Sequence, residues 1–578
     1  QGFDIREFNP KDFGFGSNVT GITNSSSTGY QYYAQRYSMT DDFPFAEINV
    51  FQLGLYAQDK WTVSDKLNLT LGLRIDVPFF MTDLQSNDKV AAETYRDGIK
   101  IDVSKYPNAK PQFSPRFGFN YKPFDDENGS LQIRGGTGLF TGTPPYVWIS
   151  NQAGNNGVLF GDLNVRAVKD KNDNIISDGR PSLGFTGNMD TYKPAEGSAT
   201  RSDIAITDPD FKYPSLWKSN IAADYKFGDG WVATVELLYS KDINAIYHDN
   251  IGLYRTEQFV NDGGAGNARP YYNGYYSDRE GNQKAANHVV MLRNTSKGHS
   301  LYTTFQLQKN FVDGILKGLY LNGSYSFGQS RGVTDGTSSV ATSAWKYRAA
   351  LDGNAEEVGY TAGSFDGRLL LSASYTANWS KYAATSFGLI YQRYRPFRYS
   401  YCYNGDANGD SQFSNDLMYI PANFDEVKDH LLPGDFDSQE DAWKAMNAFI
   451  EQDPYLSKHR GEYAERNGAV APFANQLDLS VSHDIKIYQK NGRSHTLRFS
   501  FNIANFLNLL NRNWGVVQTT VLGNQQYQFL TIPKGQGPSA ANNYTLKYTM
   551  AKDLDETFKD NLNDVSRWQM QFGIKYIF

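Results

Sequence analysis

The C-terminal segment of the chain alternates between apolar and polar side chains up to its final residue. Every second residue from Trp568 to Phe578 is apolar or aromatic, and most of the residues between them are polar or glycine. A period of two places alternate side chains on opposite faces of a β-strand. Chain ends usually fray, so a terminal amphipathic strand that ends in Phe is typical of outer-membrane β-barrels, whose last strand pairs with the first. The alternative from this segment alone is the edge strand of a soluble β-sandwich.

The same alternation recurs along the chain. Residues 66–77 place aliphatic side chains on one face, and Arg74 and Asp76 lie in mid-strand on the other face. Charges in mid-strand need water on that side, which the lumen of a barrel supplies. The pattern predicts about 13 strands, at 50–60, 66–77, 116–121, 131–140, 217–227, 231–239, 303–311, 319–327, 369–375, 383–394, 477–487, 497–503 and 567–578.

The connections between these strands alternate in length. Short turns at 62–65, 123–129, 228–230, 312–318, 378–382 and 488–493 join the strands in pairs, and long polar loops at 79–112, 143–214, 248–299, 329–366, 395–474 and 508–565 separate the pairs. Soluble domains rarely carry so many long loops, whereas outer-membrane barrels have short periplasmic turns and long external loops. We therefore predict an all-β, antiparallel transmembrane β-barrel in the outer membrane, with residues 1–46 as an external loop and 47–578 as the barrel portion.

The direction of each strand follows from this alternation. If the short turns are periplasmic, the strand 50–60 runs inward and the last strand brings Phe578 into the periplasm, where it would act as the C-terminal signal for barrel assembly. Closed bacterial barrels have an even number of strands, whereas the predicted number is odd. The chain also begins at Gln1 without a signal peptide. We therefore expect the C-terminal part of a barrel, which outer-membrane lipid surrounds and other strands complete.

Composition excludes several other classes of protein. The chain has 578 residues, which is too long for one ordinary soluble core, and no apolar run reaches the ~18 residues of a membrane-spanning helix. A net charge of -6 gives no electrostatic footprint for nucleic acid. Cys402 is the only cysteine, which excludes an intramolecular disulfide. The sequence contains no HExxH, no nucleophile elbow and no phosphate loop, so we expect no enzyme.

Four stretches together resemble a known family. They are SPRFGFNY at 114–121, RGGTGLFTG at 134–142, YLSKHRGEYAERN at 455–467 and NIANFLNLLNRNWG at 502–515. In order and spacing they resemble the barrel half of an Oar-like TonB-dependent outer-membrane receptor, of the kind abundant in Bacteroidota. The resemblance covers most of the chain from about residue 47 onward.

The resemblance implies a plugged barrel of 22 strands, of the size known for outer-membrane transporters. The plug domain and the energy-coupling box that binds TonB would lie N-terminal to the barrel and are not in this chain. The implied function is the binding and import of a ligand across the outer membrane, with TonB and a surface lipoprotein as further partners. The alternatives are a surface receptor, adhesin or assembly partner without active transport, and a membrane-embedded hydrolase. The ligand cannot be named from the sequence.

Charged residues on the polar faces of the predicted strands would face the lumen. They are Arg74, Asp76, Arg116, Arg134, Glu236, Asp478, Arg498 and Lys575. In a transporter such residues could contact the plug or an anionic substrate. The alternative is that a wet lumen tolerates charges and pairs them with one another.

The loop 395–474 contains a candidate calcium site at Asp406, Asn408, Asp410 and Asp416. Oxygen side chains at positions 1, 3 and 5 of a tight turn resemble an EF-hand loop. Two departures weaken the match, because position 6 is Ser411 rather than Gly and Asp416 stands at position 11 rather than 12. The alternative is a plain polar turn, since Asp, Asn and Gly are ordinary turn formers.

The same loop predicts a helix at 438–452. Ser438 and Asp441 resemble a capping box, and Trp443, Met446 and Ile450 fall at helical spacing. The two interpretations are a helix folded onto the barrel mouth and a lid over the substrate path. Tyrosines clustered at 271–276 and 391–401 suggest either an adaptable binding surface or an aromatic girdle.

Overall fold

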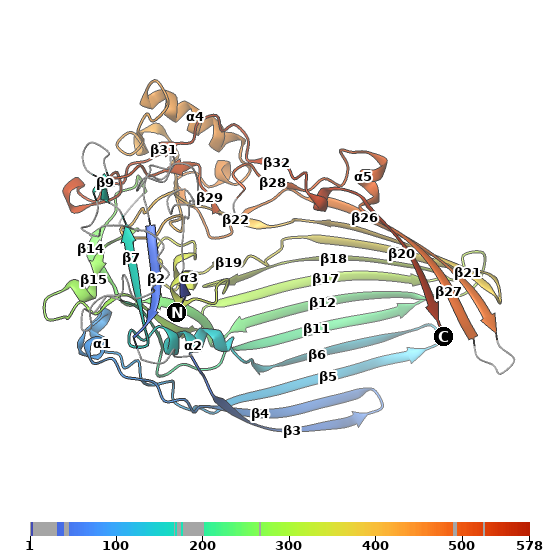
Figure 1. Ribbon diagram of the computed structural model, residues 1–578. Helices are drawn as coiled ribbons and strands as arrows, with labels where there is room; N and C mark the ends of the chain where they lie inside the picture. Colours follow the sequence, from blue (N-terminus) through green and yellow to red (C-terminus); the bar gives the residue numbers. More distant parts are fainter. Residues whose placement is uncertain are drawn as a thin grey trace.

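A large antiparallel sheet dominates the computed structural model, which describes residues 2–3, 32–39, 46–166, 168–169, 175–176, 202–264, 268–488, 494–523 and 526–578. The sheet has 14 strands, and all but β19 (Gly359–Tyr360) follow one another in chain order. The chain-order strands are β3 (Val50–Ser64), β4 (Leu67–Phe80), β5 (Gln112–Asp126), β6 (Gly129–Thr141), β11 (Ser215–Phe227), β12 (Trp231–Asp242), β17 (Gly298–Asn310), β18 (Leu319–Gly332), β20 (Arg368–Ser380), β21 (Ala383–Tyr394), β26 (Ala474–Tyr488), β27 (Ser494–Ala504) and β33 (Gln569–Ile577). Each predicted strand is thereby confirmed, and Figure 1 shows that the sheet is curved.

Most strands are longer than the alternating pattern predicts. The strand predicted at 116–121 extends over Gln112–Asp126, and the one predicted at 369–375 extends over Arg368–Ser380. The backbone ladder causes the difference, because strands continue to exchange hydrogen bonds where their side chains cease to alternate. The turns predicted at 62–65, 123–129 and 378–382 are correspondingly shorter, and the connection 489–493 lies outside the described residues.

The two faces of the sheet differ sharply in polarity. Large apolar side chains stand exposed on one face, as in Phe572, which is 78% exposed and stacks on Phe501 at 4.8 Å between ring centroids. Arg498 and Lys575 lie opposite each other in the register of β27 and β33, on the alternate face. Exposed apolar surface costs about 25 cal/mol per Å² in water, so a continuous apolar face requires an apolar surrounding such as a bilayer.

Tight turns occupy one end of the sheet. The turn between β11 and β12 contains Gly228 and Gly230, both with positive φ. A Cβ on Gly230 would lie 2.2 Å from the carbonyl oxygen of Asn310 in β17, so only glycine fits there. The C-terminus lies at this end, away from the long connections (Figure 1).

The long connections fold together at the other end of the sheet into a compact region, which we call the cap. Its strands are β10 (Ser202–Thr207), β13 (Ala245–Asn250), β14 (Leu253–Phe259), β15 (Pro270–Tyr275), β16 (Ala286–Thr295), β22 (Arg398–Tyr401), β23 (Tyr419–Ile420), β24 (Glu462–Tyr463), β25 (Ala469–Val470), β28 (Gln518–Thr520), β29 (Gln526–Tyr527), β30 (Leu530–Thr531), β31 (Thr549–Met550) and β32 (Phe558–Asp560). Further short strands are β1 (Gly2–Phe3), β2 (Tyr32–Ser38), β7 (Phe160–Arg166), β8 (Val168–Lys169) and β9 (Ile175–Ile176). The loops predicted from the sequence thus contain regular structure of their own.

Short helices complete the structure. The α-helices are α1 (Asp88–Ala92), α2 (Tyr146–Gly154), α3 (Ala341–Lys346), α4 (Gln439–Gln452) and α5 (Phe506–Leu510), and the 3₁₀ turns are η2 (Arg96–Gly98), η3 (Tyr276–Asp278), η4 (Phe424–Glu426), η5 (Leu456–Lys458), η6 (Ala540–Asn542) and η7 (Asp564–Ser566). Among the described residues, no helix is both long enough and apolar enough to span a membrane.

Helix α4 confirms the helix predicted at 438–452. The Ser438 side chain accepts a hydrogen bond from the backbone N–H of Asp441 at 3.1 Å, which caps the first turn. The expected reciprocal bond differs, because the Asp441 carboxylate accepts from the Ser438 hydroxyl at 2.7 Å instead of from its backbone. Met446 and Ile450 are buried in the cap core, so α4 is part of the folded cap.

Aromatic side chains form much of the cap core. Tyr271, Tyr272 and Tyr401 are all at most 6% exposed. The hydroxyl of Tyr401 donates to the buried carboxylate of Asp453 at 2.5 Å, so its polar end is satisfied inside the core. The interpretation of these three tyrosines as a binding surface is therefore wrong, because their side chains are buried in the cap core and do not face solvent.

Phe449 lies at the centre of this core. It is 1% exposed, and its ring lies 4.9 Å from that of Phe529 and 6.1 Å from that of Tyr527. We expect Phe449→Ala to destabilise the cap by about 3–5 kcal/mol, because it removes buried apolar surface and leaves a cavity. Hydrogen exchange of α4 and β29 measures the loss. Phe413→Ala is the matched control, since Phe413 is 68% exposed. Equal protection of α4 in both variants would contradict this account of the core.

Candidate functional site

Ion pairs neutralise several charges on the polar face of the large sheet. Within β4, Nε of Arg74 lies 2.7 Å from Asp76. Between neighbouring strands, Arg134 lies 2.9 Å from Asp224 and Arg498 lies 2.6 Å from Asp484. The sequence analysis identified the three arginines but missed Asp224 and Asp484 as partners. Strand register finds Asp484, which stands directly opposite Arg498, whereas Asp224 lies two residues along β11 from Ala222, the residue opposite Arg134.

The remaining charged residues predicted for this face have separate surroundings. Arg116 lies 4.6 Å from the centre of the Phe140 ring, and the Asp478 carboxylate accepts a hydrogen bond from the backbone N–H of Asn505 at 2.8 Å. Glu236 stands opposite Ala222 and Thr304 in register. Because the predicted residues come from strands between β4 and β33, the structure distributes them around the sheet and does not gather them into one site. Phe578 follows β33 and is 91% exposed.

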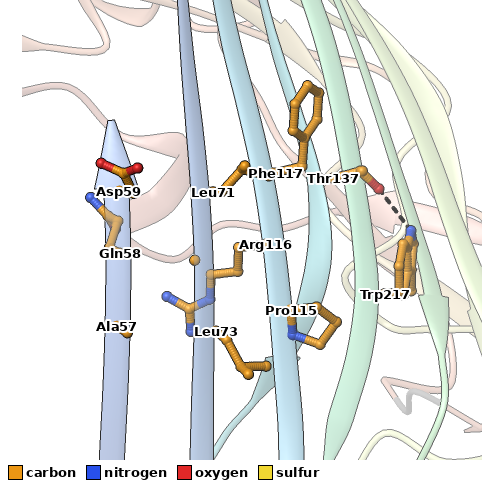
Figure 2. A pocket seen from close by; sticks show the side chains of 11 residues that line it. Ala57, Gln58, Asp59, Leu71, Leu73, Pro115, Arg116, Phe117, Thr137 and Trp217 are labelled. Atoms are coloured by element: carbon orange, nitrogen blue, oxygen red, sulfur yellow. Dashed lines mark hydrogen bonds between the residues drawn. The ribbon is translucent and has the colours of Figure 1, made fainter. Parts of the chain in front are cut away.

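A hollow of about 530 Å³ lies on the sheet over β3, β4, β5, β6 and β11 (Figure 2). Leu71, Leu73 and Phe117 line it from the apolar face, where each is exposed. The Trp217 indole closes one side and donates to the Thr137 hydroxyl at 2.8 Å, as the dashed line in Figure 2 shows. Such a lining suits hydrocarbon chains rather than a polar solute.

The acidic loop, residues 406–416, forms a tight turn in the cap. The Asp406 carboxylate accepts hydrogen bonds from the backbone N–H groups of Asn408 at 3.2 Å, Gly409 at 2.6 Å and Ser411 at 2.8 Å. The side chain of Asn408 accepts from the N–H of Asp410 at 2.9 Å. These bonds give the turn its shape, as the plain polar-turn interpretation requires.

Buried charge makes the acidic loop more than an ordinary turn. Burial, reinforced by the nearby Asp406 carboxylate, raises the pKa of Asp410 to about 7. Among the described residues, neither Asp406 nor Asp410 forms an ion pair. The side-chain oxygen of Asn415 is buried beside Asp410 without a hydrogen-bond partner. A hard cation would offset this excess of buried oxygen atoms.

Asp416 is held by a different partner. Arg269, which is fully buried, lies 3.3 Å from Asp416 and 2.8 Å from Asp262. The guanidinium therefore already provides a positive partner for the Asp416 carboxylate. In the part of the chain that the structure describes, no three His, Cys, Asp or Glu side chains are arranged to hold a metal ion. The calcium site at Asp406, Asn408, Asp410 and Asp416 therefore stays a prediction, in which Arg269 would compete with the metal ion for Asp416.

Calcium is expected to stabilise the cap through this loop. Binding to the folded state at 100 times Kd would add roughly 2.7 kcal/mol to its stability. We expect Asp410→Asn to abolish the calcium-dependent rise in the Tm of the purified protein, because it removes a fully buried carboxyl that, among the described residues, forms no ion pair. Asp425→Asn serves as the control, since the Asp425 side chain is 85% exposed. If calcium does not change the Tm of the unmodified protein, the acidic loop is a plain polar turn.

The fold and its two faces define a membrane β-barrel protein. A family model described as "Outer membrane beta barrel domain" matches residues 4–543. The chain belongs to this family, and its location is the outer membrane. None of the curated proteins matches the sequence.

Solved structures with similar folds share little sequence with the chain. The siderophore receptor PirA from Acinetobacter baumannii has a TM-score of 0.38 and 8% identity, with 83% of this chain and 47% of that chain covered. A mutant of the ferric enterobactin receptor PfeA from Pseudomonas aeruginosa has a TM-score of 0.37 and 10% identity, with coverage of 95% and 50%. The copper transporter OprC has a TM-score of 0.36 and 8% identity, with coverage of 83% and 48%. The chain spans about half the length of these proteins.

Proposed function

We propose that the chain is part of a TonB-dependent outer-membrane receptor, which binds a ligand on its outer side and admits it through the barrel. The observation that carries the proposal is the division of one membrane-spanning sheet into an apolar face and a charged face. Ion pairs such as Arg498–Asp484 need water, which an open lumen provides. The Oar-like subtype rests on the four sequence stretches that resemble that family.

The two edges of the sheet support a larger barrel. Within the described residues, β3 and β33 each pair with a neighbour on one side only. A free edge in a bilayer would leave backbone N–H and C=O groups without partners, at a cost of several kcal/mol for each group. We propose that further strands of the same protein pair with these edges, giving a 22-stranded barrel around a plug domain that engages TonB.

The cap favours one alternative function. Its buried aromatic core holds the long connections in a fixed fold at the outer end of the barrel. Such a preformed surface suits a receptor or assembly partner without active transport. A surface lipoprotein is the partner that we propose for this surface in either case. Transport and binding alone differ in whether TonB is required.

Uptake by living cells separates these two functions. Unmodified cells are expected to deplete at least one solute from a dilute growth medium, as measured by mass spectrometry of the medium. We expect cells in which the complete gene is deleted to leave this solute in the medium. Loss of TonB should have the same effect on that solute, because the plug moves only when TonB pulls it. A gene that encodes no plug and no TonB box, or depletion that persists without TonB, would favour the binding function.

A further inference from the structure

A polar cavity of about 480 Å³ lies within the cap. It is bounded by the segment that follows β18, the segment that follows α3, β22 and the segment between β24 and β25. Its lining includes two arginines, Arg348 and Arg466, together with Asp335, Ser400 and Asn467. Because hydroxyl, amide and guanidinium groups line the walls, the cavity suits a polar occupant.

Arg466 is buried and bonded to backbone oxygen atoms. It is 4% exposed, and its two Nη groups donate to the carbonyl oxygens of Gly332, Val333 and Gly359. Its Nε is buried and has no hydrogen-bond partner. The guanidinium therefore keeps one donor without a partner.

Arg348 repeats this arrangement from another segment. It is 6% exposed, and its Nη groups donate to the carbonyl oxygens of Val333 at 3.4 Å, Ala355 at 3.1 Å and Gly353. Its Nε is likewise buried without a partner. Because both arginines donate to the same carbonyl oxygen of Val333, two positive charges are held close together.

Neither guanidinium has a carboxylate in contact. In the part of the chain that the structure describes, no ion pair within 4.0 Å involves Arg348 or Arg466, whereas the neighbouring Arg331 pairs with Glu465. Burial lowers the pKa of both arginines, and Arg348 lowers that of Arg466 further, whereas Glu357, which among the described residues forms no ion pair within 4.0 Å with either, raises the pKa of both. Carbonyl oxygens offset a buried cation only in part, so the pair of arginines favours an anion.

The rest of the lining is compatible with an anion between the two arginines. Asp335 is the carboxylate of the cavity wall, and it is engaged by the Asn467 amide at 2.9 Å and the backbone N–H of Ala362 at 2.8 Å. The backbone N–H of Asn467 donates to the Ser400 hydroxyl at 2.8 Å, which holds the wall in place. Asn467 has a φ of 52°, a conformation that Asn tolerates better than most residues.

We propose that this cavity binds a carboxylate or phosphate group of a solute between Arg348 and Arg466. The two guanidinium groups would donate to the anion, and a guanidinium matches the planar or tetrahedral geometry of an oxyanion better than an ammonium does. That the bound solute is also a transported ligand rests on the proposed receptor function. The binding itself depends only on the cap.

Binding of simple anions to the purified complete protein tests the proposal. We expect inorganic phosphate or succinate to bind in isothermal titration calorimetry, and the stronger of the two identifies the preferred anion. Arg466→Lys should weaken binding about tenfold or more, because lysine keeps the charge but lacks the planar guanidinium and its several donors. Arg395→Lys is the matched control, since Arg395 pairs with Asp366 at 3.1 Å and does not line the cavity.

A variant that binds the anion more tightly cannot be explained by misfolding. We expect Asp335→Asn to strengthen anion binding several-fold, because it removes the negative charge from the cavity wall while keeping a side chain of the same shape. Failure of both probes to bind at about 10 mM, or equal affinities in the Arg466→Lys and Arg395→Lys variants, would overturn the site. Since uptake by cells is measured separately, loss of the anion site leaves the transport proposal standing, and anion binding without TonB-dependent uptake contradicts only transport.

Discussion

The pairing of backbone hydrogen bonds between neighbouring strands is the constraint on which the rest of the structure depends. A bilayer offers no water to a free N–H or C=O group, so each must find its partner in the adjacent strand. The ladders from β3 to β33 meet this requirement with antiparallel register, which shifts only near turns, as between Tyr121 and Phe124. This register in turn keeps Asp484 opposite Arg498 and Phe501 opposite Phe572. The separation of apolar and charged faces thus follows from the ladder.

The strands could be predicted from the sequence because consecutive residues of a strand face opposite sides of the sheet, one apolar and one polar. The segment 568–578 shows both faces without any information from elsewhere in the chain. Helix α4 was predictable for the same reason, since Ser438, Met446 and Ile450 lie within one segment. Even so, strand ends were missed where backbone pairing extended beyond the alternating side chains.

The cap could not be predicted because its contacts join distant segments. Arg466 reaches the carbonyl oxygen of Val333 across 133 residues, and Arg269 reaches Asp416 across 147. No periodicity marks such residues in the sequence. The tyrosines at 271–272 illustrate the consequence: an exposed aromatic patch and an aromatic core have the same local composition, and only the tertiary fold distinguishes them.

The acidic loop and the arginine cavity are built on one shared segment. The backbone N–H of Ala350 donates to the carbonyl oxygen of Asn415 at 2.9 Å, and that of Leu417 donates to the carbonyl oxygen of Ala350 at 3.1 Å. Arg348 therefore stands two residues before the strand-like bridge that holds the acidic loop. Because protein interiors are close-packed, a shift of the loop displaces this bridge and with it a wall of the cavity. The Asp410 carboxyl and the Arg348 guanidinium thus lie on two sides of the same connection, so the packing of the two sites depends on one shared segment.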